Sequence, residues 1–96
     1  MYGVIIQARI DRGRNHDEMR AMVEAEVVHT GWQVPGFSGG SWFRALDGDG
    51  GTAVMFFDSE ETARGYADGV ASRGGLAHAP VWALEGVGAY EVLART

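Results

Sequence analysis

The stretch YGVIIQARI, residues 2–10, decides the fold because it is apolar on both of its alternating tracks. In a β-strand, successive side chains point to opposite faces of the sheet. Gly3, Ile5, Gln7 and Arg9 stand on one track, in which Gln7 interrupts the apolar residues. The other track carries Tyr2, Val4, Ile6, Ala8 and Ile10. A strand that is apolar on both tracks is covered on both faces, so we expect residues 2–10 in the middle of a sheet.

Two segments carry the signals of amphipathic helices. Residues 15–31 begin with an asparagine N-cap, repeat apolar residues every three to four positions, and end at Gly31, which suits a C-cap. A second helix is expected after the N-cap Ser59, because acidic residues follow it and an apolar stripe comes next. Gly65 and Gly69 weaken this helix, since glycine has a low helix propensity. Its stripe consists of Ala63, Tyr66, Ala67 and Val70.

Three further strands are expected. A Pro-Gly pair ends the first helical region in a tight turn. Residues 37–46 and 52–57 then form a hairpin around the sequence DGDGG, because Asp-Gly pairs favour tight turns. Residues 72–86 are expected to be irregular, and residues 87–94 have the β-branched and aromatic content of a closing strand.

The expected order of elements is β-α-β-β-α-β. This order predicts an α+β, ferredoxin-like fold, with a four-stranded antiparallel sheet and two helices on one face. Residues 2–10 and 52–57 are apolar on both faces, yet the helices cover only one. An uncovered apolar sheet face predicts a partner, and the simplest partner is a second copy related by a two-fold axis. We therefore expect a homodimer with its sheets packed face to face.

The composition argues against several classes of function. Ninety-six residues make a single domain, residues 1–96, with an ordinary apolar fraction of 46%. The net charge of -5 argues against a nucleic-acid partner, whose phosphates require a basic surface. No cysteine, signal-peptide pattern or apolar run long enough to span a membrane is present. We therefore expect a cytoplasmic protein with no disulfide and no contact with a membrane.

Two short motifs point to a known family. The sequence PGF, residues 35–37, opens the expected second strand. At the end of the third strand and the start of the second helix stand Phe57, Asp58, Ser59, Glu60, Ala63 and Tyr66. Together these residues resemble the antibiotic-biosynthesis monooxygenase-like group of dimeric α/β-barrel proteins. The resemblance implies a ferredoxin-like dimer with a pocket between the helices and the sheet of each subunit. The group includes cofactor-free oxygenases of polycyclic phenols and enzymes that degrade haem.

The resemblance also implies catalytic residues. Haem-degrading members place an amide on the first strand, a tryptophan on the second helix and a haem-ligating histidine near the end of that helix. The corresponding residues here are Gln7, Tyr66 and His78. We predict Gln7 as a polar anchor, Tyr66 as a hydrogen-bond partner of a phenolic or quinone oxygen, and His78 as the acid–base group. The alternatives are that Gln7 bonds a neighbouring loop and that Tyr66 is an ordinary core residue.

Aromatic residues supply the expected substrate-binding wall, namely Trp42, Phe43 and Phe57. Trp42 and Phe43 are adjacent in one strand, so they point to opposite faces, and the sequence leaves open which of them faces the pocket. Regular alternation places Phe37 and Phe43 on one face and Trp42 on the other. A bulge at the glycines 39 and 40 would shift this register.

No metal site and no cofactor are expected. The three histidines, at positions 16, 29 and 78, lack a metal-ligand spacing, and DGDGG does not continue into an EF-hand pattern. Three functions remain compatible with the sequence, which leaves open whether the protein is an enzyme. They are a cofactor-independent monooxygenase acting on an aromatic or polycyclic small molecule, a non-catalytic ligand-binding or stress-associated module, and a haem-binding or haem-degrading monooxygenase.

Overall fold

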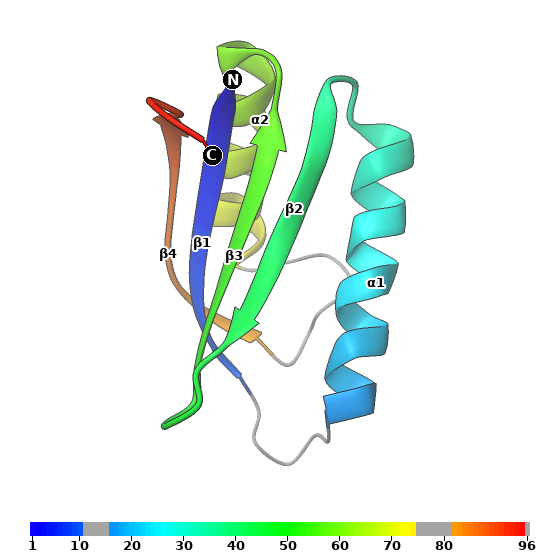
Figure 1. Cartoon of the computed structure of the whole chain (residues 1–96), viewed down its shortest axis with the longest axis vertical. Helices are drawn as coiled ribbons and strands as arrows, with labels where there is room; N and C mark the ends of the chain where they lie inside the picture. Colours follow the sequence, from blue (N-terminus) through cyan, green and yellow to red (C-terminus); the bar gives the residue numbers. More distant parts are fainter. Residues whose placement is uncertain (11–15, 75–81, 96) are drawn as a thin grey trace.

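The computed structural model describes residues 1–10, 16–74 and 82–95, which form a four-stranded sheet and two helices (Figure 1). The strands are antiparallel and lie in the order β2-β3-β1-β4. This strand order and the βαββαβ connectivity confirm the predicted ferredoxin-like α+β fold. The elements are β1 (Tyr2–Ile10), α1 (His16–Gln33), β2 (Phe37–Arg44), β3 (Gly50–Phe57), α2 (Glu60–Arg73) and β4 (Trp82–Glu91).

The hydrophobic core lies between the helices and one face of the sheet, which we call the helix face. α2 lies behind the sheet and packs against β1, β3 and β4, whereas α1 runs alongside β2 (Figure 1). Alternate residues of the central strands β1 and β3 are buried there, as strand geometry requires. The buried core residues are Val4, Ile6, Ala8, Met19, Ala53, Met55, Phe57, Ala63, Ala67 and Val70. No described helix covers the opposite side, which we call the outer face.

The predicted second helix is confirmed in its cap and in its stripe. The Thr62 amide donates to Ser59 Oγ over 3.2 Å, which satisfies one of the unpaired N–H groups of the first turn. Ala63, Ala67 and Val70 are buried, and Tyr66 packs against them. The helix ends at Gly74, whose left-handed backbone provides the C-cap.

The boundaries of α1 and β4 differ from the prediction. α1 continues through Gly31 to Gln33, so Gly31 is not its C-cap. The chain leaves the helix just before Pro35, because proline disfavours helical backbone in the residue that precedes it. β4 begins at Trp82, five positions earlier than the predicted strand 87–94, and ends at Glu91. Glycines had suggested an irregular segment there, but an edge strand tolerates them.

Both edge strands contain a bulge. In β4, Gln7 of β1 pairs with Gly86 and Ala8 pairs with Leu84, so Glu85 is the extra residue. In β2 the register shifts between Phe37 and Gly40. Bulges on edge strands disturb the ladder that a foreign strand would join, and they redirect nearby side chains. These two bulges determine which residues face each side of the sheet.

Candidate functional site

The bulge in β2 decides which aromatic side chains face the helices. Phe37 pairs with Phe57 and Gly40 pairs with Met55, so three steps along β2 match two steps along β3. Gly39, inside the shift, has a φ of 108°, in the region that favours glycine. The bulge expected at the paired glycines is therefore present.

As a consequence, Phe37 and Trp42 share the helix face. Trp42 pairs with the buried Ala53, and both aromatic residues pack against the core. Phe43 pairs with Thr52 and is 56% exposed on the outer face. The regular alternation that placed Phe37 with Phe43 is wrong, because one inserted residue reverses the face of every residue beyond it. Of the two adjacent aromatic residues, Trp42 faces the helices.

Five aromatic side chains of the described residues thus gather on the helix face, one of which is Tyr2 of β1. We call the other four the aromatic wall: Phe37, Trp42, Phe57 and Tyr66. The centroid of the buried Phe57 ring lies 5.7 Å from that of Phe37 and 5.3 Å from that of Tyr66. Both pairs are tilted, at separations typical of favourable aromatic pairs. Phe37 was not among the predicted site residues. The sequence signal for its place in the site was the pair of glycines, 39 and 40, that follows it. A residue inserted there reverses the faces of the later residues and so brings Trp42 to the same face as Phe37.

Gly40 leaves room for the Trp42 ring. A Cβ atom at position 40 would lie 3.1 Å from Cη2 of Trp42 and 2.8 Å from the carbonyl oxygen of Val54. The indole ring therefore lies over Gly40 on the helix face of β2. Its Nε1 atom is buried and has no hydrogen-bond partner among the residues that the structure describes. Buried donors without a partner are rare in proteins, so this atom requires an explanation.

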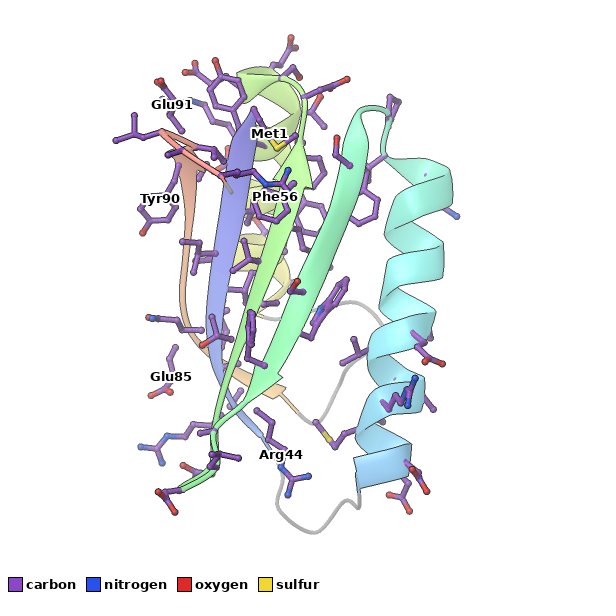
Figure 2. All side chains as sticks on the ribbon, in the orientation of Figure 1. Met1, Arg44, Phe56, Glu85, Tyr90 and Glu91 are labelled. Atoms are coloured by element: carbon purple, nitrogen blue, oxygen red, sulfur yellow. The ribbon has the colours of Figure 1, made fainter. Side chains whose placement is uncertain are left out.

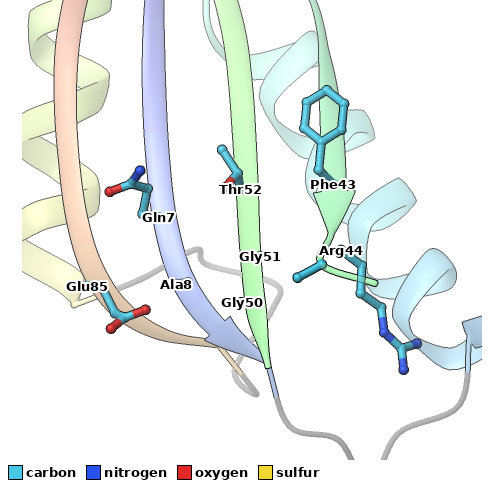
Figure 3. A pocket seen from close by; sticks show the side chains of 9 residues that line it. Gln7, Ala8, Phe43, Arg44, Gly50, Gly51, Thr52 and Glu85 are labelled. Atoms are coloured by element: carbon cyan, nitrogen blue, oxygen red, sulfur yellow. The ribbon is translucent and has the colours of Figure 1, made fainter. Parts of the chain in front are cut away.

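Gln7 lies on the outer face and not in the helix–sheet pocket where it was predicted. Its side chain is exposed, because it alternates along β1 with the buried Ile6 and Ala8. It forms a row with Thr52 and Phe43 across three neighbouring strands (Figure 3). Of the six predicted site residues, Trp42, Phe57 and Tyr66 therefore lie on the helix side of the sheet and Gln7 and Phe43 on the outer face, and His78 lies outside the described residues.

A shallow hollow of about 460 Å³ opens on the outer face around this row (Figure 3). It is walled by the Phe43 ring and by the polar side chains of Gln7, Thr52 and Glu85. Its other lining residues are Ala8, Arg44, Ala45, Gly50 and Gly51. A broad, open hollow on an uncovered sheet face differs from the concave, mostly apolar sites that enclose small ligands.

Charged side chains cross-link the sheet beside this hollow. The Arg9 guanidinium lies 3.5 Å from the Glu85 carboxylate and 4.0 Å from that of Asp49. The bulge places Glu85 within this reach. All three side chains are about half exposed, so these ion pairs contribute little to stability. These ion pairs place both signs of charge at one end of the outer face.

The other end of the outer face carries Phe56 and the C-terminal segment (Figure 2). The Arg95 guanidinium stacks over the Phe56 ring at 4.4 Å and donates to Sδ of Met1 over 2.9 Å. The Val92 amide donates to the Met1 carbonyl oxygen over 3.0 Å. Tyr90, 55% exposed, lies on β4 opposite Gly3 of β1. This end of the face is therefore aromatic and apolar, with one cation above it.

Comparison with solved structures identifies the architecture. A mutant of MhuD, crystallised with two manganese protoporphyrin IX molecules bound per active site, matches 100% of this chain and 98% of its own, with a TM-score of 0.66 and 21% identity. A protein from Chloroflexus aurantiacus J-10-fl, provisionally classed as an antibiotic biosynthesis monooxygenase, matches 99% of this chain and 96% of its own, with a TM-score of 0.55 and 21% identity. The chain has the same fold as both proteins. No family model and no curated protein sequence matches it.

Within residues 1–10, 16–74 and 82–95, no three His, Asp or Glu side chains lie close enough together to hold a metal ion. The same residues include no helix that is long and apolar enough to cross a membrane.

Proposed function

We propose that this protein is a small cofactor-independent monooxygenase that oxidises an aromatic small molecule between its helices and the helix face of the sheet. The aromatic wall carries the proposal, because it concentrates four rings on the one side of the sheet that the helices enclose. Sites for small ligands are mostly apolar and aromatic, with a few polar groups that fix orientation. The fold shared with the C. aurantiacus protein, which is provisionally classed as an antibiotic biosynthesis monooxygenase, supports the reaction class.

The proposed chemistry asks little of the protein beyond binding and proton transfer. A tricyclic anthrone has an acidic methylene carbon whose carbanion can react with dioxygen directly. That carbon loses two hydrogens and becomes a carbonyl, and the second oxygen atom leaves as water. The aromatic wall would hold the rings, Tyr66 would bind a ring oxygen, and His78 would take up the proton. The part given to His78 rests on the sequence alone.

Anthrone oxidation under air tests this proposal, followed by anthraquinone absorbance and oxygen consumption. We expect turnover by the native protein and a loss of roughly tenfold in Tyr66→Phe, which removes one hydrogen bond and leaves the ring in place. The Gln7→Ala variant decides between the two faces of the sheet. Unchanged turnover in Gln7→Ala agrees with a site on the helix face. If turnover instead falls in Gln7→Ala and not in Tyr66→Phe, the site lies on the outer face. Binding of anthrone without oxygen consumption would favour the non-catalytic module.

We also propose that a second copy covers the outer face. Ile5, Val54, Phe56 and Phe43 give this face an apolar centre, and Tyr90 extends it onto β4. Apolar patches that span several strands mark interaction surfaces, and most homo-oligomers are two-fold dimers. The two signs of charge at Arg9 and Glu85 suit a surface that pairs with itself. Size-exclusion chromatography with light scattering should give twice the mass of one chain at micromolar concentration.

Haem is a second candidate substrate, because the MhuD mutant was crystallised with a related porphyrin, manganese protoporphyrin IX, in its active site. The aromatic wall supplies apolar rings for a porphyrin to pack against, whereas the side chains of all three histidines lie outside the part of the chain that the structure describes. Titration with hemin tests this candidate. A shifted Soret band that is lost in His78→Ala would support it, and an unshifted band would reject it.

A further inference from the structure

The indole N–H of Trp42 is a buried donor on the helix face to which the core offers no hydrogen-bond acceptor. Nε1 has no hydrogen-bond partner in the described part of the chain, although the rest of the side chain packs against the core. A tryptophan in such a position normally satisfies its N–H, because an unpaired donor is costly in an apolar environment. The position therefore favours an oxygen acceptor that is supplied from outside the core.

The backbone sets the face of the sheet and the height at which the Trp42 side chain lies. The bulge at Gly39 sets the face on which Trp42 lies, and the pairing with Ala53 sets its height along β3. Gly40 has no side chain, which leaves space for the indole ring. A Cβ atom at position 40 would lie 3.1 Å from Cη2 of Trp42. α1 packs along this strand. A donor held in this way can bind an acceptor without ordering its own side chain first, which is the advantage of a preorganised site.

We infer that Trp42 Nε1 donates a hydrogen bond to an oxygen of the bound aromatic molecule, and so holds the oxygen-bearing edge of its rings against β2 on the side facing α1. Trp42 is then a specificity-determining residue, which selects ring systems with a carbonyl or phenolate oxygen at that edge. This inference rests on the proposed binding of aromatic molecules at the helix face. The bond would form with an unreactive ketone as well as with a substrate, so it can be tested without turnover.

Fluorenone and fluorene provide a matched pair of ligands, because they share one tricyclic frame and differ by a carbonyl in place of a methylene. We expect the native protein to bind fluorenone roughly tenfold more tightly than fluorene, the size of effect that one hydrogen bond to a buried donor produces. Trp42→Phe should bind both compounds with the affinity that the native protein has for fluorene. Circular dichroism establishes whether this variant is folded.

A second measurement avoids the variant. In the ¹⁵N-labelled native chain, the indole N–H resonance of Trp42 should move downfield with fluorenone and should not move downfield with fluorene, which offers no acceptor. Substituting Trp32 and Trp82 by phenylalanine assigns the signal. Equal affinities and an unmoved indole signal overturn this inference while leaving the aromatic site intact. Failure of both compounds to bind overturns the inference and the proposed site together.

Discussion

Replacing Gly40 by alanine should destabilise the protein and displace Trp42, because the added methyl group has no space. Its Cβ would lie 2.8 Å from the Val54 carbonyl oxygen, 3.1 Å from Cη2 of Trp42 and 3.4 Å from Cα of Met55. Two of these three atoms belong to the backbone of the central strand β3, which is hydrogen-bonded on both sides. They cannot move without disturbing the sheet, so the strain falls on β2 and on the indole ring.

The size of the effect follows from the nature of these neighbours. Overpacking a close-packed site costs about 1–3 kcal/mol when backbone must shift to relieve it. In a domain of this size, each kcal/mol lowers Tm by roughly 4–8 °C. A side chain that could swing aside would reduce the penalty. Here only Trp42 can do so, and its movement would expose the indole to water and shift its emission to longer wavelength.

Gly65→Ala provides the matched control. Gly65 is exposed in the middle of α2, and a Cβ there would meet no atom within 4 Å. The same substitution should therefore stabilise the protein by about 1 kcal/mol, the difference in helix propensity between the two residues. Urea unfolding followed by circular dichroism measures both variants, at one protein concentration because self-association changes apparent stability. Gly40→Ala as stable as the native protein would refute the packing described around Trp42.

Substitutions at three more positions probe the rest of the fold. Ser59→Ala should lower the free energy of unfolding by about 1 kcal/mol, since it removes the acceptor for the Thr62 amide, and Ser59→Asp should restore most of the loss. Phe43→Asp should halve the mass measured by light scattering, because it places a charge in the proposed interface, and an unchanged mass would contradict that interface. Arg95→Ala should cost less than about 1 kcal/mol in urea unfolding, because its contact with Phe56 is exposed, and a larger loss would mean that the C-terminal segment has a structural role.

The sequence predicted the central strands and α2 well because their signals are strong and local. Residues 2–10 and 52–57 are almost continuously apolar, and Ser59 with its following acidic residues marks a helix start. Glycine was the ambiguous residue. Gly31 suggested a helix end and Gly86 a loop, yet one lies inside α1 and the other inside β4. Glycine permits many conformations, so tertiary packing decides which one it adopts.

The position of Gln7 could have been predicted from the sequence. Its track ends in Arg9 and is the more polar of the two tracks of β1, so it was the better candidate for the face without helices. The family resemblance favoured the opposite conclusion, because it matched Gln7 to an amide at a similar position along the chain. Strand alternation places a side chain on one face or the other and leaves no intermediate position. A resemblance that matches residues by their position along the chain, without regard to the face of the strand, can assign a residue to the wrong face.

The adjacency of Trp42 and Phe43 couples the two faces of the sheet. One residue lies in the aromatic wall and the next lies on the proposed interface, and a single peptide unit joins them. β2 is an edge strand, paired only with β3, so a partner pressing on Phe43 can shift the strand and with it the indole of Trp42. Lower turnover in Phe43→Asp would therefore not place Phe43 in the site. The fluorenone preference reports on the Trp42 N–H directly, so a preference that falls together with turnover in Phe43→Asp indicates that the indole has shifted.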